Sequence, residues 1–160
     1  MIMVLTPIPT PNDNTLNIVT GADVNGTAYG GYTITNNYAV ANNTVTISDG
    51  TVIQNVYGGG SNDGNATGNK IEINGGTIQG VYGGRSRTGH VTDNTVKITG
   101  GIIERVVYGG YVTQSAGSAT ATENVVEIRS GTVGGNVSAA ITRRVAISRA
   151  TALPSAAARC

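Results

Sequence analysis

The chain of 160 residues contains no Trp, no Phe and a single Cys, and only 12% of its residues are charged. Because the large aromatic side chains Trp and Phe are missing, aliphatic residues must form whatever core the fold has. The lone cysteine, Cys160, excludes a disulfide framework and a cysteine-rich metal site. A formal net charge of +1 gives no field that attracts nucleic acid or an anionic membrane. We therefore expect no cofactor, no nucleic-acid partner and no insertion of this segment into a membrane.

Glycine is abundant, with 24 residues, and much of it belongs to an internal repeat. The motif Asn-x-apolar-x-Ile occurs five times, at spacings of 29, 26, 25 and 30 residues. A second motif, Tyr-Gly-Gly, occurs four times, each time between two copies of the first. The first motif begins at Asn14, Asn43, Asn69, Asn94 and Asn124, and the second begins at Tyr29, Tyr57, Tyr82 and Tyr108. A period of this length indicates a stacked repeat architecture.

Each repeat has room for two strands, and its polar segment has room for a third. Apolar and polar residues alternate in Asn-x-Val-x-Ile, which is typical of a strand with one buried face. A glycine turn such as Gly75-Gly76 follows, and the run from Thr77 to Tyr82 alternates again. A variable polar segment, for example residues 60–68, then leads to the next Asn. No stretch of the sequence has the period of a helix.

These features predict an all-β fold: a single right-handed parallel β-solenoid of about five coils, each of 25–30 residues. One coil cannot bury its apolar face alone, whereas stacked coils place like side chains on like. The predicted inward ladders are Leu16/Val45/Ile71/Val96/Val126 and Ile18/Ile47/Ile73/Ile98/Ile128. Outward, Glu72, Lys97 and Glu127 share one column with alternating charge, which favours this register. We expect residues 1–13 to be irregular, 14–137 to form the solenoid and 138–160 to be an aberrant tail.

The tail departs from the repeat after Val137. Where the pattern requires Tyr-Gly-Gly, the chain reads Ser138-Ala139-Ala140, followed by sequence rich in Arg and Ala. Synonymous codons for Ser138 to Thr142 exist that encode Tyr-Gly-Gly-Tyr-His once a single base is restored. The same shifted frame near the last residues encodes Asn-Ser-Val-Thr-Ile-Ser-Gly-Gly. We therefore interpret residues 138–160 as an out-of-frame continuation of the repeat, in which case the solenoid has an open end that can pair with another chain.

The two repeated polar positions predict two ladders along the stack. The amides of Asn14, Asn43, Asn69, Asn94 and Asn124 would form a structural ladder, in which each side chain bonds the next. The rings of Tyr29, Tyr57, Tyr82 and Tyr108 would stack in the same way, as a structural feature. If those rings are exposed instead, they form a stripe that binds a sugar or a protein. Both interpretations of the tyrosine column stay open at this point.

Two other polar segments are better explained as surface turns. His90, with Asp93 nearby, occurs in only one repeat and has no nucleophile at a defined spacing. Residues 58–65 are similar to a calcium-binding turn, but the equivalent segments 84–90 and 110–117 lack the aspartate. The acidic residues are scattered over different repeat positions, and no nucleotide-binding or hydrolase motif is found. We therefore expect no catalytic residue and no metal site, and a protein that is not an enzyme.

Written out as Val-Tyr-Gly-Gly, a Gly/Ser/Asn-rich loop, Asn-x-Val-x-Ile and Gly-Gly-Thr-Ile/Val, the repeat resembles passenger regions of autotransporter and haemagglutinin-like surface proteins of Gram-negative anaerobic bacteria. The resemblance covers residues 14–137. It implies secretion and display at the cell surface as part of an outer-membrane-anchored parent protein, with a structural or adhesive role toward a host or matrix glycan or protein. Two alternatives stay open: a fragment of a β-helix carbohydrate-active enzyme, and a filament subunit that associates end to end.

Overall fold

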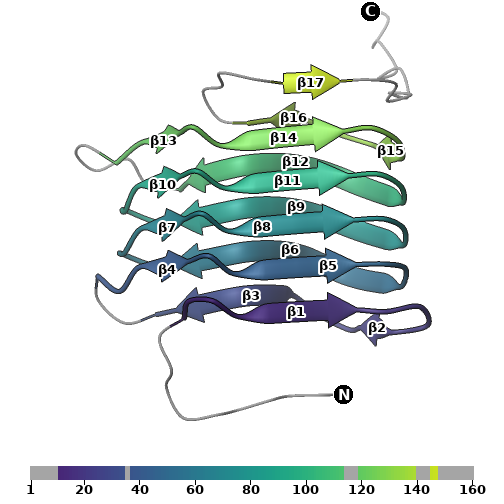
Figure 1. Ribbon diagram of the computed structural model, residues 1–160, viewed down its shortest axis with the longest axis horizontal. Helices are drawn as coiled ribbons and strands as arrows, with labels where there is room; N and C mark the ends of the chain where they lie inside the picture. Colours follow the sequence, from purple (N-terminus) through teal and green to yellow (C-terminus); the bar gives the residue numbers. More distant parts are fainter. Residues whose placement is uncertain (1–10, 35–36, 114–118, 140–144, 148–160) are drawn as a thin grey trace, which may run out of the picture.

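The computed structural model describes residues 11–34, 37–113 and 119–139, together with the backbone of 145–147. Its strands lie in three parallel sheets that wind around one core, so the predicted β-solenoid is confirmed. Figure 1 shows the turns stacked one above another in a right-handed path. The six-stranded sheet, sheet A, lies in front, and the seven-stranded sheet, sheet B, lies behind it. No helix long and apolar enough to cross a membrane occurs in the part of the chain that the structure describes.

Each turn of the solenoid contributes one strand to sheet A, a longer stretch to sheet B and a two-residue strand to sheet C. Sheet A contains β1 (Thr15–Ile18), β5 (Thr44–Ile47), β8 (Lys70–Ile73), β11 (Thr95–Ile98), β14 (Val125–Ile128) and β17 (Val145–Ile147). Sheet B contains β2 (Asp23–Val24), β3 (Ala28–Thr33), β6 (Thr51–Ser61), β9 (Thr77–Ser86), β12 (Ile102–Val112), β15 (Thr132–Val133) and β16 (Val137–Ser138). Sheet C contains β4 (Val40–Ala41), β7 (Ala66–Thr67), β10 (Val91–Thr92) and β13 (Ala121–Thr122).

The solenoid has about four turns rather than the predicted five. Complete turns run from β1 to β13, and β14 begins another. In that last turn the long strand of sheet B is replaced by β15 and β16, each of two residues, and both pair with β12. The fifth Asn motif therefore starts a turn that the described residues leave incomplete.

The predicted strand register is confirmed along the whole of sheet A. Val96, for example, lies beside Ile71 on one side and Val126 on the other, and Ile98 lies between Ile73 and Ile128. The side chains of both inward ladders from the second coil onward are at most 2% exposed. Sheet B supplies the opposite wall of the core with Val52, Val56, Ile78, Val81, Ile103 and Val107. Burial of these aliphatic ladders, stacked at the strand spacing, is the main source of stability in such a fold.

One corner of every turn uses a left-handed backbone conformation. The residue just before each ladder asparagine, where sheet C passes into sheet A, has a φ between 57° and 66°. These residues are Asp13, Asn42, Gly68, Asp93 and Glu123. Glycine and asparagine adopt this conformation readily, whereas a glutamate there is strained. The corner keeps its shape in all five positions although its side chain changes, so the backbone geometry is imposed by the ladder that follows.

Part of the tail is regular. Ser138 belongs to β16, Ala139 is buried, and β17 continues sheet A with Val145 beside Val126 and Ile147 beside Ile128. The other residues of the tail, 140–144 and 148–160, lie outside the described residues, as do residues 1–10. The interpretation of residues 138–160 as an out-of-frame continuation stays a prediction about the gene sequence.

Candidate functional site

The asparagine column forms an amide ladder inside the solenoid. Each side-chain Nδ2 donates to Oδ1 of the asparagine in the next turn, at 2.8 Å from Asn14 to Asn43 and at 2.9 Å for the three following pairs. The same Oδ1 also accepts the backbone N–H of the preceding asparagine, for example from Asn69 to Asn94 at 3.0 Å. The second amide proton goes to a backbone carbonyl of the preceding turn, as from Asn94 to Ala66 at 2.9 Å.

This ladder leaves no polar group for a ligand. Asn43, Asn69 and Asn94 are 0% exposed, and no buried side-chain N or O atom of the described residues lacks a partner. A fully satisfied buried network of this kind stabilises one register of the coils, because a slip would leave amide groups unpaired in the core. The role of the column is therefore structural.

The glycines of Tyr-Gly-Gly make room for the asparagine ladder. A β-carbon added at the second glycine, Gly59 or Gly84, would lie 2.5 Å from Nδ2 of Asn69 or Asn94. Real β-carbons essentially never approach another atom so closely. The two sequence motifs are therefore halves of one packing unit, in which the backbone of sheet B lies directly against the amides that precede sheet A.

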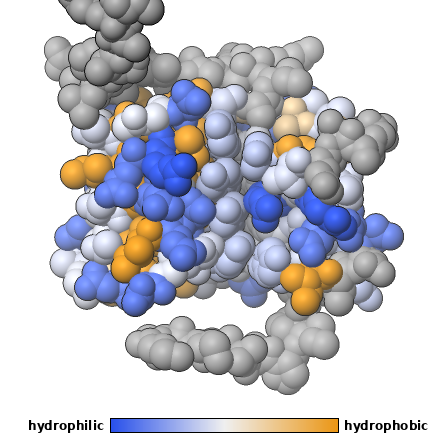
Figure 2. Space-filling view, turned by 180° about the vertical axis from the view of Figure 1, so that it is seen from behind, coloured by the Kyte–Doolittle hydropathy of each residue, from blue (hydrophilic) through white to orange (hydrophobic). Residues whose placement is uncertain are grey.

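The tyrosines stack on the outer face of sheet B. The rings of Tyr29, Tyr57 and Tyr82 are nearly parallel, with centroids 4.9 Å and 4.8 Å apart and interplanar angles of 11° and 20°. The ring faces inside this stack are covered by neighbouring rings, and Tyr57 is only 8% exposed. Figure 2 shows this side of the molecule, where a band of intermediate hydropathy runs parallel to the stacking axis. In this part of the column, a flat aromatic stripe open to solvent is absent.

The stack changes at Tyr108. The ring of Tyr108 is tilted by 58° relative to that of Tyr82, with centroids 5.6 Å apart. It lies instead against Tyr111, at 5.4 Å and 21°. Tyr111 belongs to a second outward column, in which it lies beside Arg85 on β9. Because Tyr108 turns toward Tyr111, the space between β9 and β12 on the outer face is left partly open.

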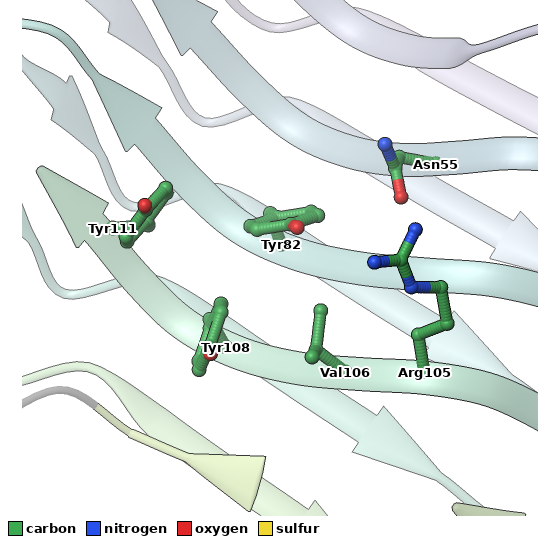
Figure 3. A pocket seen from close by; sticks show the side chains of 6 residues that line it. All are labelled: Asn55, Tyr82, Arg105, Val106, Tyr108 and Tyr111. Atoms are coloured by element: carbon green, nitrogen blue, oxygen red, sulfur yellow. The ribbon is translucent and has the colours of Figure 1, made fainter. Parts of the chain in front are cut away.

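A small pocket of about 220 Å³ lies at this break. Three tyrosines and Val106 form its walls together with Asn55 and Arg105; the tyrosines are Tyr82, Tyr108 and Tyr111. Figure 3 shows the Arg105 side chain extending from β12 across β9 toward Asn55 on β6. The space exists because Gly80, between Asn55 and Val106 in the register, has no side chain. We call this pocket the tyrosine–arginine slot.

The electrostatics of the slot favour a negatively charged group. Arg105 is exposed and has no ion pair within the described part of the chain, unlike Arg87, which pairs with Asp63, and Arg129, which pairs with Glu127. No carboxyl group is among the residues that line the slot. A second guanidinium, that of Arg85, lies 5.8 Å from the ring centroid of Tyr57 on the same face.

The hydroxyls of Tyr29, Tyr57 and Tyr82 stay protonated at neutral pH. Burial, followed by the neighbouring Tyr82, raises the pKa of Tyr57 to about 12. Burial also raises the pKa of Tyr82, with further contributions from Tyr108 and Tyr111, against an opposing effect of Arg105. The pKa of Tyr29 is raised by burial and by Tyr32. The phenol groups of Tyr29, Tyr57 and Tyr82 are therefore hydrogen-bonding groups and not bases under ordinary conditions.

The other polar residues considered from sequence make local contacts. His90 Nδ1 lies 3.1 Å from Thr120 Oγ1, so the imidazole contacts the next turn and does not pair with Asp93. The Asp63 carboxylate accepts hydrogen bonds from Arg87 Nη2 at 2.7 Å and from Thr88 Oγ1 at 3.1 Å, which lower its pKa. The described residues contain no group of three or more His, Cys, Asp or Glu that could hold a metal ion.

Sequence reasoning missed most of the slot. It identified Tyr82 and Tyr108, but not Tyr111, Arg105 and Asn55. One signal was present: the position after Tyr-Gly-Gly reads Tyr32, Gly60, Arg85 and Tyr111 in successive turns, and these four are register partners. Arg105 had no such signal. Between Ile103 and Val106, β12 contains one more residue than the paired part of β9, so the simple repeat alignment fails at Arg105.

Comparison with known proteins identifies no relative: no protein-family model matches the chain, and no curated protein or solved structure matches it either. Its function is therefore inferred from the arrangement of its own residues.

Proposed function

We propose that the chain is a non-enzymatic structural and adhesive segment of a secreted, surface-displayed repeat protein, and that the outer face of sheet B is its contact surface. The observation that carries this proposal is the tyrosine–arginine slot, which interrupts an otherwise tightly packed solenoid and places aromatic and cationic groups side by side. Tyrosine and arginine are the residue types enriched at binding surfaces.

The structural half of the proposal is supported by the uniform construction of the turns. Each described turn repeats the aliphatic ladder, the amide ladder and the left-handed corner, so successive turns are related by nearly the same translation. Nearest-neighbour stacking of this kind gives a stiff, extended body with long exposed faces. Such a body is suited to hold a contact surface away from the place where the parent protein is anchored.

The adhesive half is supported by the chemistry of the slot. Hydrolysis of a glycoside typically requires two carboxyl groups on either side of the bond, and the residues that line the slot include none. A general base works best with a pKa near the operating pH, whereas the pKa of Tyr82 is raised above its ordinary value of 10.0. Binding without turnover is the activity that these groups support.

Binding of the purified chain to arrays of glycans and of extracellular-matrix proteins tests the proposal. We expect a saturable signal that weakens in Tyr111→Ala, because Tyr111 is 40% exposed and forms one wall of the slot. Tyr38→Ala is the matched control, since Tyr38 is 63% exposed and does not line the slot. No binding to any immobilised ligand would contradict the adhesive role.

The same preparation separates the two other functions considered. Release of new reducing ends or of unsaturated sugars from a polysaccharide would show an enzyme. Particle length that grows with protein concentration, measured by light scattering, would show a filament subunit. Under the proposal, the chain yields neither result while it binds its ligand.

A further inference from the structure

We propose that the tyrosine–arginine slot binds the carboxylated ring of an acidic polysaccharide, a uronic acid residue, with the carboxylate directed to Arg105. This inference rests on the proposed adhesive function and specifies its ligand class. It is carried by the joint presence of an unpaired guanidinium, a side-chain amide and aromatic walls around one opening.

The size of the slot indicates one unit of a longer ligand. Pockets for independent small-molecule ligands typically enclose about 300–1,000 Å³, and the slot encloses about 220 Å³. It also lies on the outer face of sheet B, so a chain can enter and leave it along the surface. A polymer that places one ring in the slot and extends its neighbours over the face satisfies both observations.

The charge of the slot selects a carboxylate. An arginine fork presents two parallel N–H donors to the two oxygens of a carboxylate. Asn55 turns its amide oxygen toward the guanidinium (Figure 3), so Arg105 supplies the donors. One guanidinium balances one carboxylate, whereas a phosphate monoester carries a charge of roughly −1.5 to −2 at neutral pH. Arg105 forms no ion pair within the described part of the chain, so its charge is available to a bound anion.

The walls of the slot suit a sugar ring. Tyr82, Tyr108 and Tyr111 offer apolar ring edges and faces together with hydroxyl groups, which match the mixed C–H and O–H surface of a pyranose. Gly80 of β9 has no side chain to occupy the slot: a β-carbon added there would first meet Asn55, Val106 and Tyr82. The raised pKa of Tyr82 keeps its hydroxyl available as a donor.

Isothermal titration of the full chain with tetramers of galacturonate, glucuronate and mannuronate tests this ligand class. We expect at least one uronate to bind, and its methyl ester, which has the same ring but no charge, to bind at least tenfold more weakly. Arg105→Gln should reduce affinity for the uronate tenfold or more, and Arg105→Lys should reduce it less because it keeps the charge. Arg129→Gln, which removes one positive charge beside sheet A, should leave the affinity unchanged.

A second variant tests the location without removing a charge. Gly80→Val places side-chain atoms in the slot, and its β-carbon would first meet Oδ1 of Asn55, at 2.6 Å, which is the far end of a partly exposed side chain and can turn away. We expect this variant to keep the wild-type melting temperature within a few degrees and to lose the uronate. Equal binding of ester and acid, or uronate binding that survives both Arg105→Gln and Gly80→Val, would overturn the inference.

The outcomes also separate this inference from the proposed function. If all three uronates fail while a neutral glycan or a matrix protein binds, the ligand class is wrong and the adhesive role stands. If no ligand binds in the arrays or in the titration, both the uronate ligand class and the adhesive function are contradicted. Conversion of a uronate to an unsaturated product would overturn the non-enzymatic role.

Discussion

Asn94 occupies the space that Gly84 leaves open: a β-carbon at Gly84 would lie 2.5 Å from Asn94 Nδ2, and its three nearest atoms would all belong to that side chain. The two residues are ten positions apart, with Gly84 in β9 and Asn94 directly before β11. The amide has no freedom to retreat, because its Nδ2 donates to Asn124, Ala66 and Thr92. A glycine of sheet B and an asparagine at the start of sheet A are therefore one structural unit.

Gly84→Ala should destabilise the fold by about 1–3 kcal/mol, because the added methyl group overpacks a rigid part of the core. In the Asn94→Ala background the same change should cost much less, since the three atoms nearest to the added β-carbon have been removed. A double-mutant cycle from urea unfolding measures this coupling. Equal costs of Gly84→Ala in the two backgrounds would show that the glycine has another role.

Asn94→Ala alone should lower the free energy of unfolding by about 2–4 kcal/mol. The backbone N–H of Asn69 and the carbonyl of Ala66 would lose a buried partner, and the amide ladder would be interrupted. The control is Asn74→Ala, because Asn74 is exposed and its side chain bonds only Thr99 on the surface. That change should cost less than about 0.5 kcal/mol.

Glu123→Gly should stabilise the protein by about 1 kcal/mol. Glu123 has a φ of 58°, a conformation that costs an L-residue about 1–2 kcal/mol and costs glycine almost nothing. The gain is reduced by the greater freedom of glycine in the unfolded chain. Glu127→Gly in β14 is the control, where the same exchange should destabilise because the residue lies in a strand. Thermal unfolding of both variants gives the comparison, and loss of stability in both would contradict the strain at position 123.

Alkaline pH should weaken the fold through Tyr57. The pKa of Tyr57 is raised to about 12 from an ordinary value of 10.0, chiefly by burial. Between these two values the unfolded chain loses the phenol proton while the folded chain keeps it, so the free energy of unfolding falls as pH rises. The loss from this one group is on the order of 2 kcal/mol by pH 12. Urea unfolding between about pH 9 and pH 11 measures the slope, which should be smaller in Tyr57→Phe.

The core and its register could be predicted from the sequence because each is repeated in every turn. The ladders through Val96 and Ile98 follow from a short, regular period that fits stacked coils, and the amide ladder follows from one asparagine at the same place in each copy. The number of turns was overestimated by one, because the last Asn motif was counted as a coil although the residues after it form only two short strands of sheet B.

The slot could be predicted only in part because it arises where the repeat is broken. Gly80 stands where a neighbouring turn has Asn55, and Tyr111 turns the ring of Tyr108 out of the stack. Between Ile78 and Gly80, β9 is one residue shorter than the paired parts of β6 and β12, and Arg105 lies in the part of β12 that has this extra residue. The repeat explains the scaffold, whereas the slot arises from differences between adjacent turns, which can be recognised only once the turns lie side by side.

The pairing of each glycine with an asparagine ten residues later affects how such an array can change in length. A segment from one glycine turn to the next contains both the residue that makes room and the residue that fills it, as Gly59 and Asn69 or Gly84 and Asn94 do. A duplication or deletion of one such segment therefore leaves every remaining turn with its own matched pair. Gene segments of this kind can be gained or lost by recombination without any compensating substitution elsewhere in the chain.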